Sequence, residues 1–279
     1  MNSSTKYLLS HPDELKKHIS HVLLTQHNPF PDHHPFHKTS HLFSVLLSLT
    51  VYDDQGKKQK EPYLILNKRS MQVKQPGDIC LPGGRMMVKW DRILSYILRL
   101  PRFPFALFQN KVCLTKQTHL DASYLSRLLA TALRESFEEM RLNPFNIDFL
   151  GNLPEQRLVL FTKSIWPMVI WINRQTSFSP NWEVERILYV PLAELLNQIN
   201  YVRCRVRFVS KPTQCILTPS MDYHGFQLNT GDILWGATFR IVMSFLSIVF
   251  GFELPAIETL PVVSKWMDAT YLTPQKKQG

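Results

Sequence analysis

The stretch "ALRESFEEMRL", residues 132–142, places Glu135, Glu138 and Glu139 close together in a chain whose formal net charge is +10. In an α-helix, residues three and four positions apart share a face, so Glu135 would lie beside both other carboxylates. Like charges at that spacing repel and destabilise the helix. A solvated acidic face is one interpretation and a cation-binding face is the other. This stretch alone does not decide between them.

A hard divalent cation would offset the repulsion, because Mg²⁺ and Mn²⁺ prefer oxygen ligands. Such a cation also bridges phosphate oxygens, neutralises charge in a transition state and can activate a water. Arg134 can pair with one carboxylate and hold its rotamer. The same glutamates therefore suit chemistry on a phosphorylated substrate.

The bulk composition is that of a globular protein. The 279 residues are 44% hydrophobic and 19% charged, which allows one large domain or two small ones. The 32 basic and 22 acidic residues suit a polyanionic partner, either nucleic acid, an acidic membrane or a phosphorylated small molecule. The four cysteines form no CxxC pair, which favours a reducing compartment without a zinc or disulfide framework.

The sequence favours neither a signal peptide nor a membrane-spanning helix. The first 20 residues lack the apolar core of a signal peptide, so we expect a cytoplasmic location. Residues 233–252 have about the length of a span, roughly 20 residues. Arg240 lies near their middle, however, where a charge is costly. A buried helix that begins after Gly236 is the favoured interpretation.

Hydrophobic periodicity predicts a mixture of strands and helices rather than a regular βαβ array. Eight of the ten histidines lie in the first 41 residues, in and around a Pro-rich loop. His33, His34, His37 and His41 have spacings a metal could use, but a solvated loop is favoured because no Cys or acidic ligand pattern accompanies them. The predicted helices cover 12–26, 121–140, 192–199 and about 236–250, and the clearest strands cover 41–53, 61–70, 147–155, 164–173 and 184–192.

A glycine-rich loop, "QPGDICLPGGR" at residues 75–85, follows the second predicted strand. Paired glycines let the backbone approach an anionic ligand closely. The spacing matches neither a P-loop nor a dinucleotide-binding fingerprint.

Residues 85–120, between this loop and the glutamate helix, are basic, apolar and broken by prolines, and Asp91 is their only acid. We interpret them as an insertion that caps the site. Their aromatic side chains, Phe103, Phe105 and Phe108, need a surface to pack on. The core is the favoured surface, and a second subunit, an acyl chain or a membrane are the alternatives.

Together the glycine loop and the glutamate helix resemble the Nudix hydrolase family. Its signature is Gly, five residues, Glu, seven residues and then Arg-Glu-apolar-any-Glu-Glu-any-Gly-apolar. The matching positions are Gly84, Arg134, Glu135, Glu138, Glu139 and Leu142.

Residues 66–84 further resemble the extension found in the coenzyme A pyrophosphatase branch, and "ILWGATFRIV" at 233–242 is similar to a helix start of that branch. The places filled in the extension are Arg69, Ser70, Val73, Lys74, Gly77, Pro82, Gly83 and Gly84.

The chain departs from the signature in three ways. Gly84 and Arg134 are 50 positions apart, where the plain signature has 14. The signature Glu falls on Ser126 or Trp90, depending on the end from which it is counted, and Asp121 is the nearest acid we expect to replace it. Arg141 stands where the signature has a glycine, so the helix end lacks its usual left-handed residue.

The resemblance implies an α+β fold, an α/β/α sandwich whose mixed sheet is flanked by the glutamate helix and a C-terminal helix. We expect an N-terminal helix and loop at 1–38, a Nudix domain at 39–255 with the insertion at 85–120, and a tail at 256–279.

The resemblance also implies site roles. Glu135, Glu138 and Glu139 would bind Mg²⁺ or Mn²⁺, with Glu138, Glu139 and Arg134 catalytic. Glu183 is a further candidate ligand or an ordinary surface acid. The substrate-binding candidates are Arg69, Lys74, Gly83 and Gly84.

The function so implied is hydrolysis of the diphosphate of coenzyme A or its acyl derivatives, giving 4′-phosphopantetheine and adenosine 3′,5′-bisphosphate. The alternatives are ADP-ribose or another nucleoside diphosphate derivative as substrate, or an inactive Nudix fold used for binding. The lost signature Glu and Arg141 favour inactivity, whereas the intact glutamate triplet opposes it. We expect a small-molecule partner, no nucleic acid and no membrane span, and leave a homodimer open.

Overall fold

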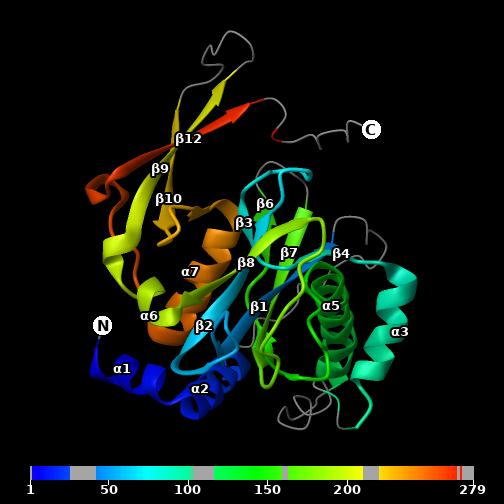
Figure 1. Ribbon diagram of the computed structural model, residues 1–279. Coiled ribbons are helices and arrows are strands. Elements are labelled where there is room, and N and C mark those ends of the chain that lie inside the picture. The colour runs from blue at the N-terminus through cyan, green and yellow to red at the C-terminus, as the bar shows by residue number, and fades with distance from the viewer. Residues whose placement is uncertain are drawn as a thin grey trace.

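The computed structural model describes residues 2–25, 42–101, 103, 116–158, 163–209, 220–268 and 271 (Figure 1). The four histidines considered as metal ligands, His33, His34, His37 and His41, lie outside the described residues. Phe105 and Phe108 of the predicted insertion also lie outside them.

A mixed sheet, eight-stranded within the described residues, forms the centre of the molecule. β1 (Leu42–Tyr52) pairs antiparallel with β2 (Lys58–Arg69) and parallel with β7 (Lys163–Ile172). The remaining strands extend or cover these three, and they are β3 (Ile79–Cys80), β4 (Gly83–Arg85), β5 (Ile147–Asn152), β6 (Gln156–Leu158) and β8 (Val184–Pro191).

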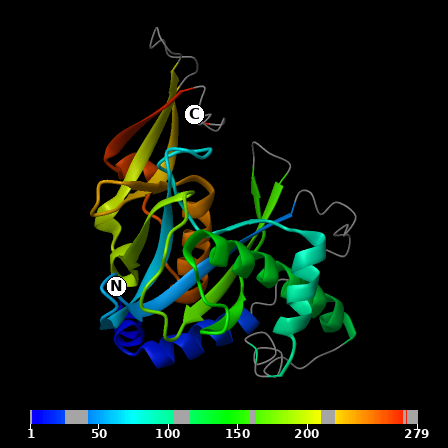
Figure 2. The same cartoon turned by 45° about the vertical axis from the view of Figure 1, so that its right-hand side comes forward.

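Both faces of this sheet are buried, which is why its central strands are nearly continuous apolar runs. Leu47 and Leu49 of β1 belong to one hydrophobic core, whereas Leu46 belongs to the other. The second core includes the inner face of α5 (Lys116–Met140), and the first includes α2 (Pro12–Thr25) and α7 (Gly236–Phe250). Figures 1 and 2 show the sheet between these helices. The predicted α+β sandwich is confirmed.

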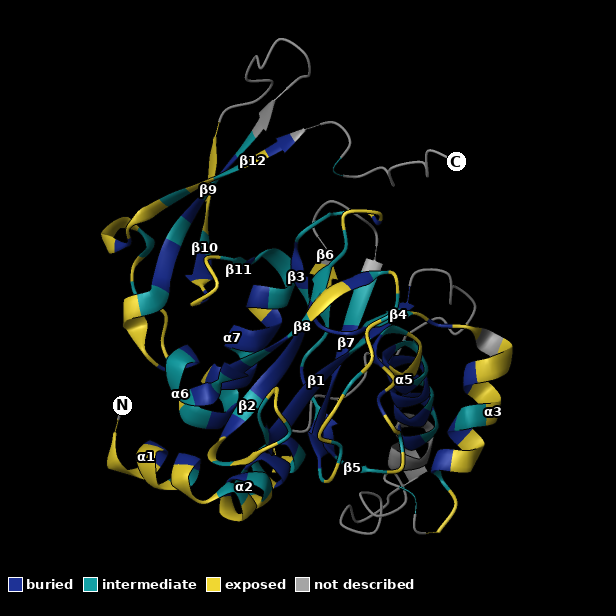
Figure 3. Cartoon of the chain, viewed as in Figure 1, coloured by how far each residue is buried: buried dark blue, intermediate teal, exposed yellow. Residues whose placement is uncertain are grey.

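The predicted C-terminal helix is also confirmed, since α7 begins at Gly236 and ends at Phe250. Its inward side chains are buried in the first core (Figure 3). Arg240 points to another part of the chain, where its Nη2 donates a hydrogen bond to the carbonyl of Arg157 at 3.1 Å. No helix in the described part of the chain is both long enough and apolar enough to cross a bilayer.

A second sheet lies beside the first and includes part of the segment expected to form the C-terminal tail. Its strands are β9 (Tyr201–Val209), β10 (Met221–Gln227), β11 (Ile233–Trp235) and β12 (Val262–Asp268). β12 falls within the residues predicted as a tail, yet it pairs parallel with β9 from Val262 opposite Arg203 to Asp268 opposite Val209. The sequence analysis did not predict this strand, because seven residues without regular alternation of apolar and polar side chains are recognisable as a strand only by the distant strand with which they pair.

Helices α1 (Ser3–Ser10) and α6 (Leu192–Leu195) cover the first core near β2. The predicted insertion contributes α3 (Val88–Leu98), which lies on the outer side of α5 and adds no strand within the described residues (Figure 2). Helix α5 begins at Lys116, so Asp121 lies inside the helix and not at its predicted start.

Candidate active site

The glycine loop and the glutamate helix meet because β4 pairs with the beginning of β1. Ser44 lies opposite Gly84, and Val45 lies opposite Gly83. A Cβ atom on Gly84 would stand 2.5 Å from Cδ of Glu135, and one on Gly83 would collide with the carbonyl oxygen of Ser44. Gly83 also has φ +150°, which side chains rarely adopt. The paired glycines are therefore required by the close approach of β4 to α5 and β1.

The Glu139 carboxylate is held from two sides. Nδ2 of Asn67, in β2, donates to Oε2 at 2.8 Å, and the Gly83 N–H donates to Oε1 at 3.4 Å. Asn67 is fully buried, and its own Oδ1 has no hydrogen-bond partner among the described residues. Sequence reasoning missed Asn67, although an amide inside the apolar run of β2 was a usable signal.

Burial raises the pKa of Glu139 to about 7, since a desolvated carboxylate is penalised for its charge. The charge of Glu135 raises it further, while the hydrogen bonds from Asn67 and Gly83 and the charge of Arg69 lower it. Burial also raises the pKa of Glu135, against the stabilising charge of Arg134. The two carboxylates therefore lie close together in a partly buried space, and a bound cation would offset the repulsion between their charges.

This pKa predicts a pH-dependent stability of the metal-free protein. The folded-state pKa of Glu139 is raised from 4.5 to about 7, so its contribution to stability is complete below pH 4.5 and is lost as the pH rises through about 7. Chemical denaturation in EDTA should show wild type losing ~3 kcal/mol relative to Glu139→Gln over that window. A difference that stays constant with pH would contradict the assignment.

Arg134 pairs with the other two glutamates of the helix, Glu135 and Glu138. Its Nη1 donates to Oε1 of Glu135 at 2.9 Å and to Oε1 of Glu138 at 3.4 Å, and its Nη2 donates to the carbonyl of Arg85 at 3.1 Å. Glu138 is the most exposed of the three glutamates, with 55% of its side chain accessible. Arg134 is thus placed to orient Glu135, as the sequence predicts, while Glu138 faces solvent.

The other side of the Arg134 guanidinium meets an acid that sequence reasoning missed. Its Nε donates to Oδ1 of Asp91 at 2.8 Å, although Asp91 belongs to α3 of the insertion. Asp91 is only 1% exposed, and it also accepts from the Thr131 hydroxyl at 2.8 Å and from the Met87 N–H at 2.6 Å. Burial alone would lower the pKa of the Arg134 guanidinium. The negative charges and hydrogen bonds of Asp91 and Glu135 outweigh burial, so the pKa is raised.

The remaining candidates are Arg69 at the end of β2, Lys74 in the loop after it and Glu183 just before β8. Nε of Arg69 donates to the Lys74 carbonyl at 2.8 Å, and the Arg69 charge acts on Glu139. The Lys74 side chain is exposed to solvent. Glu183 is half-buried, and its carbonyl accepts the Ser70 N–H at 2.8 Å. The structure thus brings Arg69 towards the glutamates, while Lys74 lies in the loop after β2 and Glu183 lies just before β8, next to the start of that loop.

A buried aspartate fixes the base of this loop. Asp78 accepts hydrogen bonds from Trp235 Nε1 at 3.2 Å, from Lys265 Nζ at 2.5 Å and from the Tyr271 hydroxyl. Trp235 and Lys265 belong to the second sheet, in β11 and β12. The second sheet therefore helps to hold the loop that carries Arg69 beside the glutamate helix.

Glu135, Glu138 and Glu139 are the residues that could hold a metal. Within the ranges that the structure describes, no three His, Cys, Asp or Glu side chains are arranged as a ready-made ligand set. Arg134 contacts two of these glutamates and Asn67 holds the third. The chemistry of the donors nevertheless suits a hard cation, because carboxylates with raised pKa values lie beside Oδ1 of Asn67, which accepts no hydrogen bond from the part of the chain that the structure describes.

The sequence matches no protein-family model, and no curated protein matches it significantly. Solved structures do resemble the described fold. A Nudix hydrolase from M. smegmatis, RenU, has a TM-score of 0.34 and 12% identity over 56% of this chain and 73% of its own. A Nudix hydrolase from Alicyclobacillus acidocaldarius has a TM-score of 0.37 and 14% identity over 57% of this chain and 82% of its own.

The Nudix domain of Shewanella oneidensis NrtR, solved with ADP ribose, has a TM-score of 0.32 and 17% identity over 62% of this chain and 83% of its own. All three are Nudix proteins. At TM-scores and identities this low, the similarity carries no argument about the reaction of this chain.

The structure shows what stands at the positions where the chain differs from the Nudix signature. The acid beside Arg134 is Asp91, one residue after the Trp90 position counted from Gly84. Ser136 fills an apolar slot of the signature, and its buried hydroxyl donates to the Ala132 carbonyl at 2.7 Å. The inserted helix thus keeps an acid beside the arginine, and helix α5 itself satisfies the polar group of Ser136.

Arg141, which stands where the signature has a glycine, adopts the left-handed conformation that a glycine would take. Its φ is +58°, and its N–H closes helix α5 on the Phe137 carbonyl at 3.0 Å. Helix α7 ends in the same way, but at Gly251 with φ +63°. A residue with a Cβ atom is strained in this conformation by roughly 1–2 kcal/mol.

Replacing Arg141 by glycine should therefore stabilise the protein. The guanidinium also lies 5.1 Å over the Phe137 ring, and losing this contact offsets part of the gain. We expect a net increase of ~0.5–1 kcal/mol in the free energy of unfolding, measured by urea denaturation. Arg141→Ala keeps the strain and loses the same contact, so it should be no more stable than wild type. If Arg141→Gly and Arg141→Ala had the same free energy of unfolding, the backbone at residue 141 would not be strained.

Proposed function

We propose that this protein is a Nudix-type hydrolase that splits a diphosphate linkage in coenzyme A or its derivatives with the help of Mg²⁺ or Mn²⁺. The observation that carries the proposal is the junction of the glycine pair with two carboxylates of raised pKa, Glu135 against Gly84 and Glu139 against Gly83. Such crowding of partly buried acids is typical of sites that bind cations and handle phosphates.

The metal would be held by Glu135 and Glu139, with Glu138 as the third carboxylate. When bound, it would supply charge neutralisation for the diphosphate and a lowered pKa for a coordinated water. The chain's own residues position these donors. Asn67 fixes the Glu139 carboxylate, and Gly84 leaves room for the Glu135 carboxylate. Arg134, fixed by Asp91, orients Glu135 from the opposite side.

The reaction consumes one water. Its oxygen forms a bond to one phosphorus, the bridging P–O bond breaks, and each product leaves as a monophosphate. For coenzyme A these are 4′-phosphopantetheine and adenosine 3′,5′-bisphosphate. Arg69 is our candidate for binding the diphosphate, because a guanidinium pairs with phosphate oxygens through two N–H groups and its charge already acts at Glu139. Exposed Lys74 would add a point charge for the adenosine phosphates.

A substrate panel tests this proposal. Purified protein with Mg²⁺ is incubated with coenzyme A, an acyl-coenzyme A and ADP-ribose, and the monophosphate products are quantified by chromatography. We expect coenzyme A compounds to be hydrolysed with the highest kcat/KM and EDTA to abolish the activity. Preference for ADP-ribose would support diphosphate hydrolysis as the reaction but would reject coenzyme A as the substrate. Absence of turnover on every diphosphate would favour an inactive Nudix fold used for binding.

A further inference from the structure

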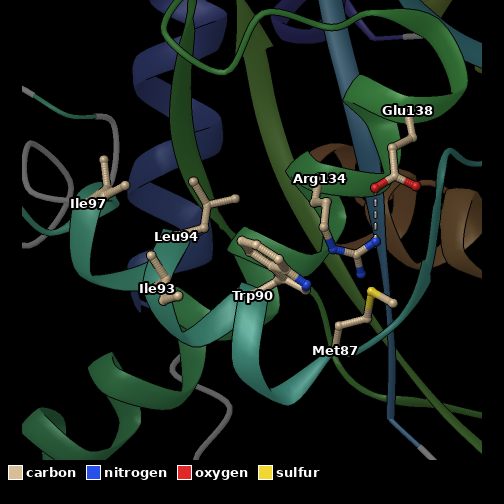
Figure 4. A pocket seen from close by; sticks show the side chains of 7 residues that line it. All are labelled: Met87, Trp90, Ile93, Leu94, Ile97, Arg134 and Glu138. Carbon is tan, nitrogen blue, oxygen red and sulfur yellow. Dashed lines mark hydrogen bonds and ion pairs between the residues drawn. The ribbon is translucent and has the colours of Figure 1, made fainter.

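Arg134 and Arg69 both lie beside the glutamates, but their surroundings differ. Arg134 donates hydrogen bonds to three acids, which are Asp91, Glu135 and Glu138. Figure 4 shows the Arg134 side chain directed at Glu138, where the two residues line an apolar groove against α3. The Arg134 guanidinium is thus already paired with acids. Of the two arginines, Arg69 is the one left to bind an anionic substrate, and its charge acts at Glu139.

The backbone of Arg69 closes the loop that follows β2. Its N–H donates to the Asp78 carbonyl at 2.9 Å, and its own carbonyl accepts the Gly77 N–H at 3.0 Å. The Arg69 side chain is held from within the loop as well, because its Nε donates to the Lys74 carbonyl at 2.8 Å. The place of the guanidinium therefore depends on the conformation of residues 70–78.

The Asp78 carboxylate ties this loop to the far end of the chain. Its Oδ1 accepts from Nε1 of Trp235 in β11 and from Nζ of Lys265 in β12, and its Oδ2 accepts from the Tyr271 hydroxyl. The Lys265 ammonium also lies 5.2 Å over the Trp235 ring, so the donors pack against one another. Asp78 is 8% exposed, so these contacts are shielded from water. One buried carboxylate thus joins the loop to β11, β12 and Tyr271.

Backbone contacts hold the loop at the same place. The Gln75 N–H donates to the Tyr271 carbonyl at 2.8 Å, and the Gln75 carbonyl accepts the Asp78 N–H at 3.3 Å. Gln75 has φ +54°, a left-handed conformation that is strained for a residue with a Cβ atom. Such a conformation persists where surrounding contacts impose it, and strained residues of this kind cluster at functional sites. The contacts with Tyr271 and Asp78 therefore hold the loop in a shape that it would not take alone.

The Asp78 cluster borders the candidate active site at Cys80. Burial raises the pKa of the Cys80 thiol to about 12, and the charges of Glu139 and Asp78 raise it further while that of Arg69 lowers it. Cys80 thus lies within electrostatic reach of all three charged groups. Asp78 therefore stands behind Arg69, on the side of the loop away from α5.

We propose that Asp78 is a positioning residue for substrate binding, through which β11, β12 and Tyr271 hold Arg69 at the diphosphate. The inference rests on the proposed function, because it takes the diphosphate to be the ligand of Arg69. The glutamates are held by other contacts, so loosening this loop weakens diphosphate binding and leaves the chemical step intact. A uniform contribution to binding of this kind appears in KM and not in kcat. Part of the segment expected to be a tail thus takes part in recognising the substrate.

The test removes one donor to Asp78 at a time. Lys265→Met deletes the ammonium but keeps an apolar side chain over the Trp235 ring, and Tyr271→Phe deletes the hydroxyl alone. Loss of a hydrogen bond to a charged group should raise KM for the best substrate of the panel by about tenfold, with kcat within about threefold of wild type. The control Asp222→Asn weakens an acid–arginine pair elsewhere in the second sheet and should change neither constant. Unchanged KM in both donor variants would overturn the proposal.

Binding is also measured without turnover. Adenosine 5′-(α,β-methylene)diphosphate, whose bridging carbon resists hydrolysis, is titrated calorimetrically in Mg²⁺, and its Kd should rise as KM does. In Arg69→Met the loop has no guanidinium to place, so adding Lys265→Met should weaken binding by less than about twofold more. Full additivity of the two substitutions would show that Lys265 does not act through Arg69 and would overturn the proposal. Failure of wild type to bind the analogue would overturn it as well.

Hydrogen–deuterium exchange gives a readout that needs no ligand. In Lys265→Met and Tyr271→Phe, the amides of residues 70–78 should exchange faster, whereas those of α5 should keep their wild-type rates. Faster loop exchange with non-additive analogue binding supports the positioning role even if no diphosphate is hydrolysed. Hydrolysis of a diphosphate with additive effects on binding, or with unchanged loop exchange, would overturn the positioning role and leave the proposed function intact.

Discussion

Replacing Glu139 with glutamine is expected to reduce Mg²⁺-dependent diphosphate hydrolysis by about a hundredfold or more. The substitution keeps the shape of the side chain and one of the two hydrogen bonds that the carboxylate accepts from Asn67 and Gly83, but it removes the charge that a cation or an activated water requires. Loss of several kcal/mol of transition-state stabilisation corresponds to this factor in kcat. Steady-state kinetics with the best substrate of the panel measures it.

The matched control is Glu185→Gln. Glu185 is a half-exposed acid of β8 that pairs with Lys68 at 3.1 Å, and it has no role in the proposed reaction. It should leave kcat within twofold of wild type. Thermal unfolding of both variants verifies that they are folded. Turnover by Glu139→Gln at the wild-type rate would remove Glu139 from the active site.

Replacing Asp91 with alanine should have the largest effect on stability. The carboxylate is almost completely buried, and its loss leaves Nε of Arg134 and the Met87 N–H without their acceptor and the Thr131 hydroxyl with the Arg127 carbonyl alone. Removing one partner of a buried ion pair typically costs ~3–5 kcal/mol. We expect a decrease of this size in the free energy of unfolding, measured by urea denaturation, and a lower kcat because Arg134 no longer holds Glu135.

Two comparisons make this prediction specific. Asp222→Ala breaks the more exposed pair with Arg205, whose atoms lie 2.8 Å apart, and should lower the free energy of unfolding far less than Asp91→Ala does, because solvent screens the exposed pair. The double variant Asp91→Leu with Arg134→Leu removes both buried charges and should recover much of the stability without recovering activity. A free energy of unfolding for Asp91→Ala equal to that of Asp222→Ala would show that the Asp91–Arg134 pair does not fasten α3 to α5.

The sequence by itself determined the features that depend on local pattern. The spacing of apolar residues predicted helix α7 and the strands β1, β2, β7 and β8, because periodicity records which faces are buried. The run from Arg134 to Glu139 predicted a helix with crowded carboxylates, and the helix is present. The paired glycines predicted a close backbone approach to an anionic ligand, which stays a prediction, while the structure places Gly84 against the Glu135 carboxylate.

Only the tertiary structure decided which distant residues complete the site. Asn67 reaches Glu139 across 72 positions and Asp91 reaches Arg134 across 43, and no spacing rule connects residues so far apart. The motif count pointed to Ser126, Trp90 or Asp121, yet the acid beside Arg134 comes from the helix inserted between the two halves of the motif. The same limit hid β12, whose partner lies 59 positions earlier at Val262 opposite Arg203. Side chains such as these acquire their role through packing of separate elements, which depends on the whole chain and not on local periodicity.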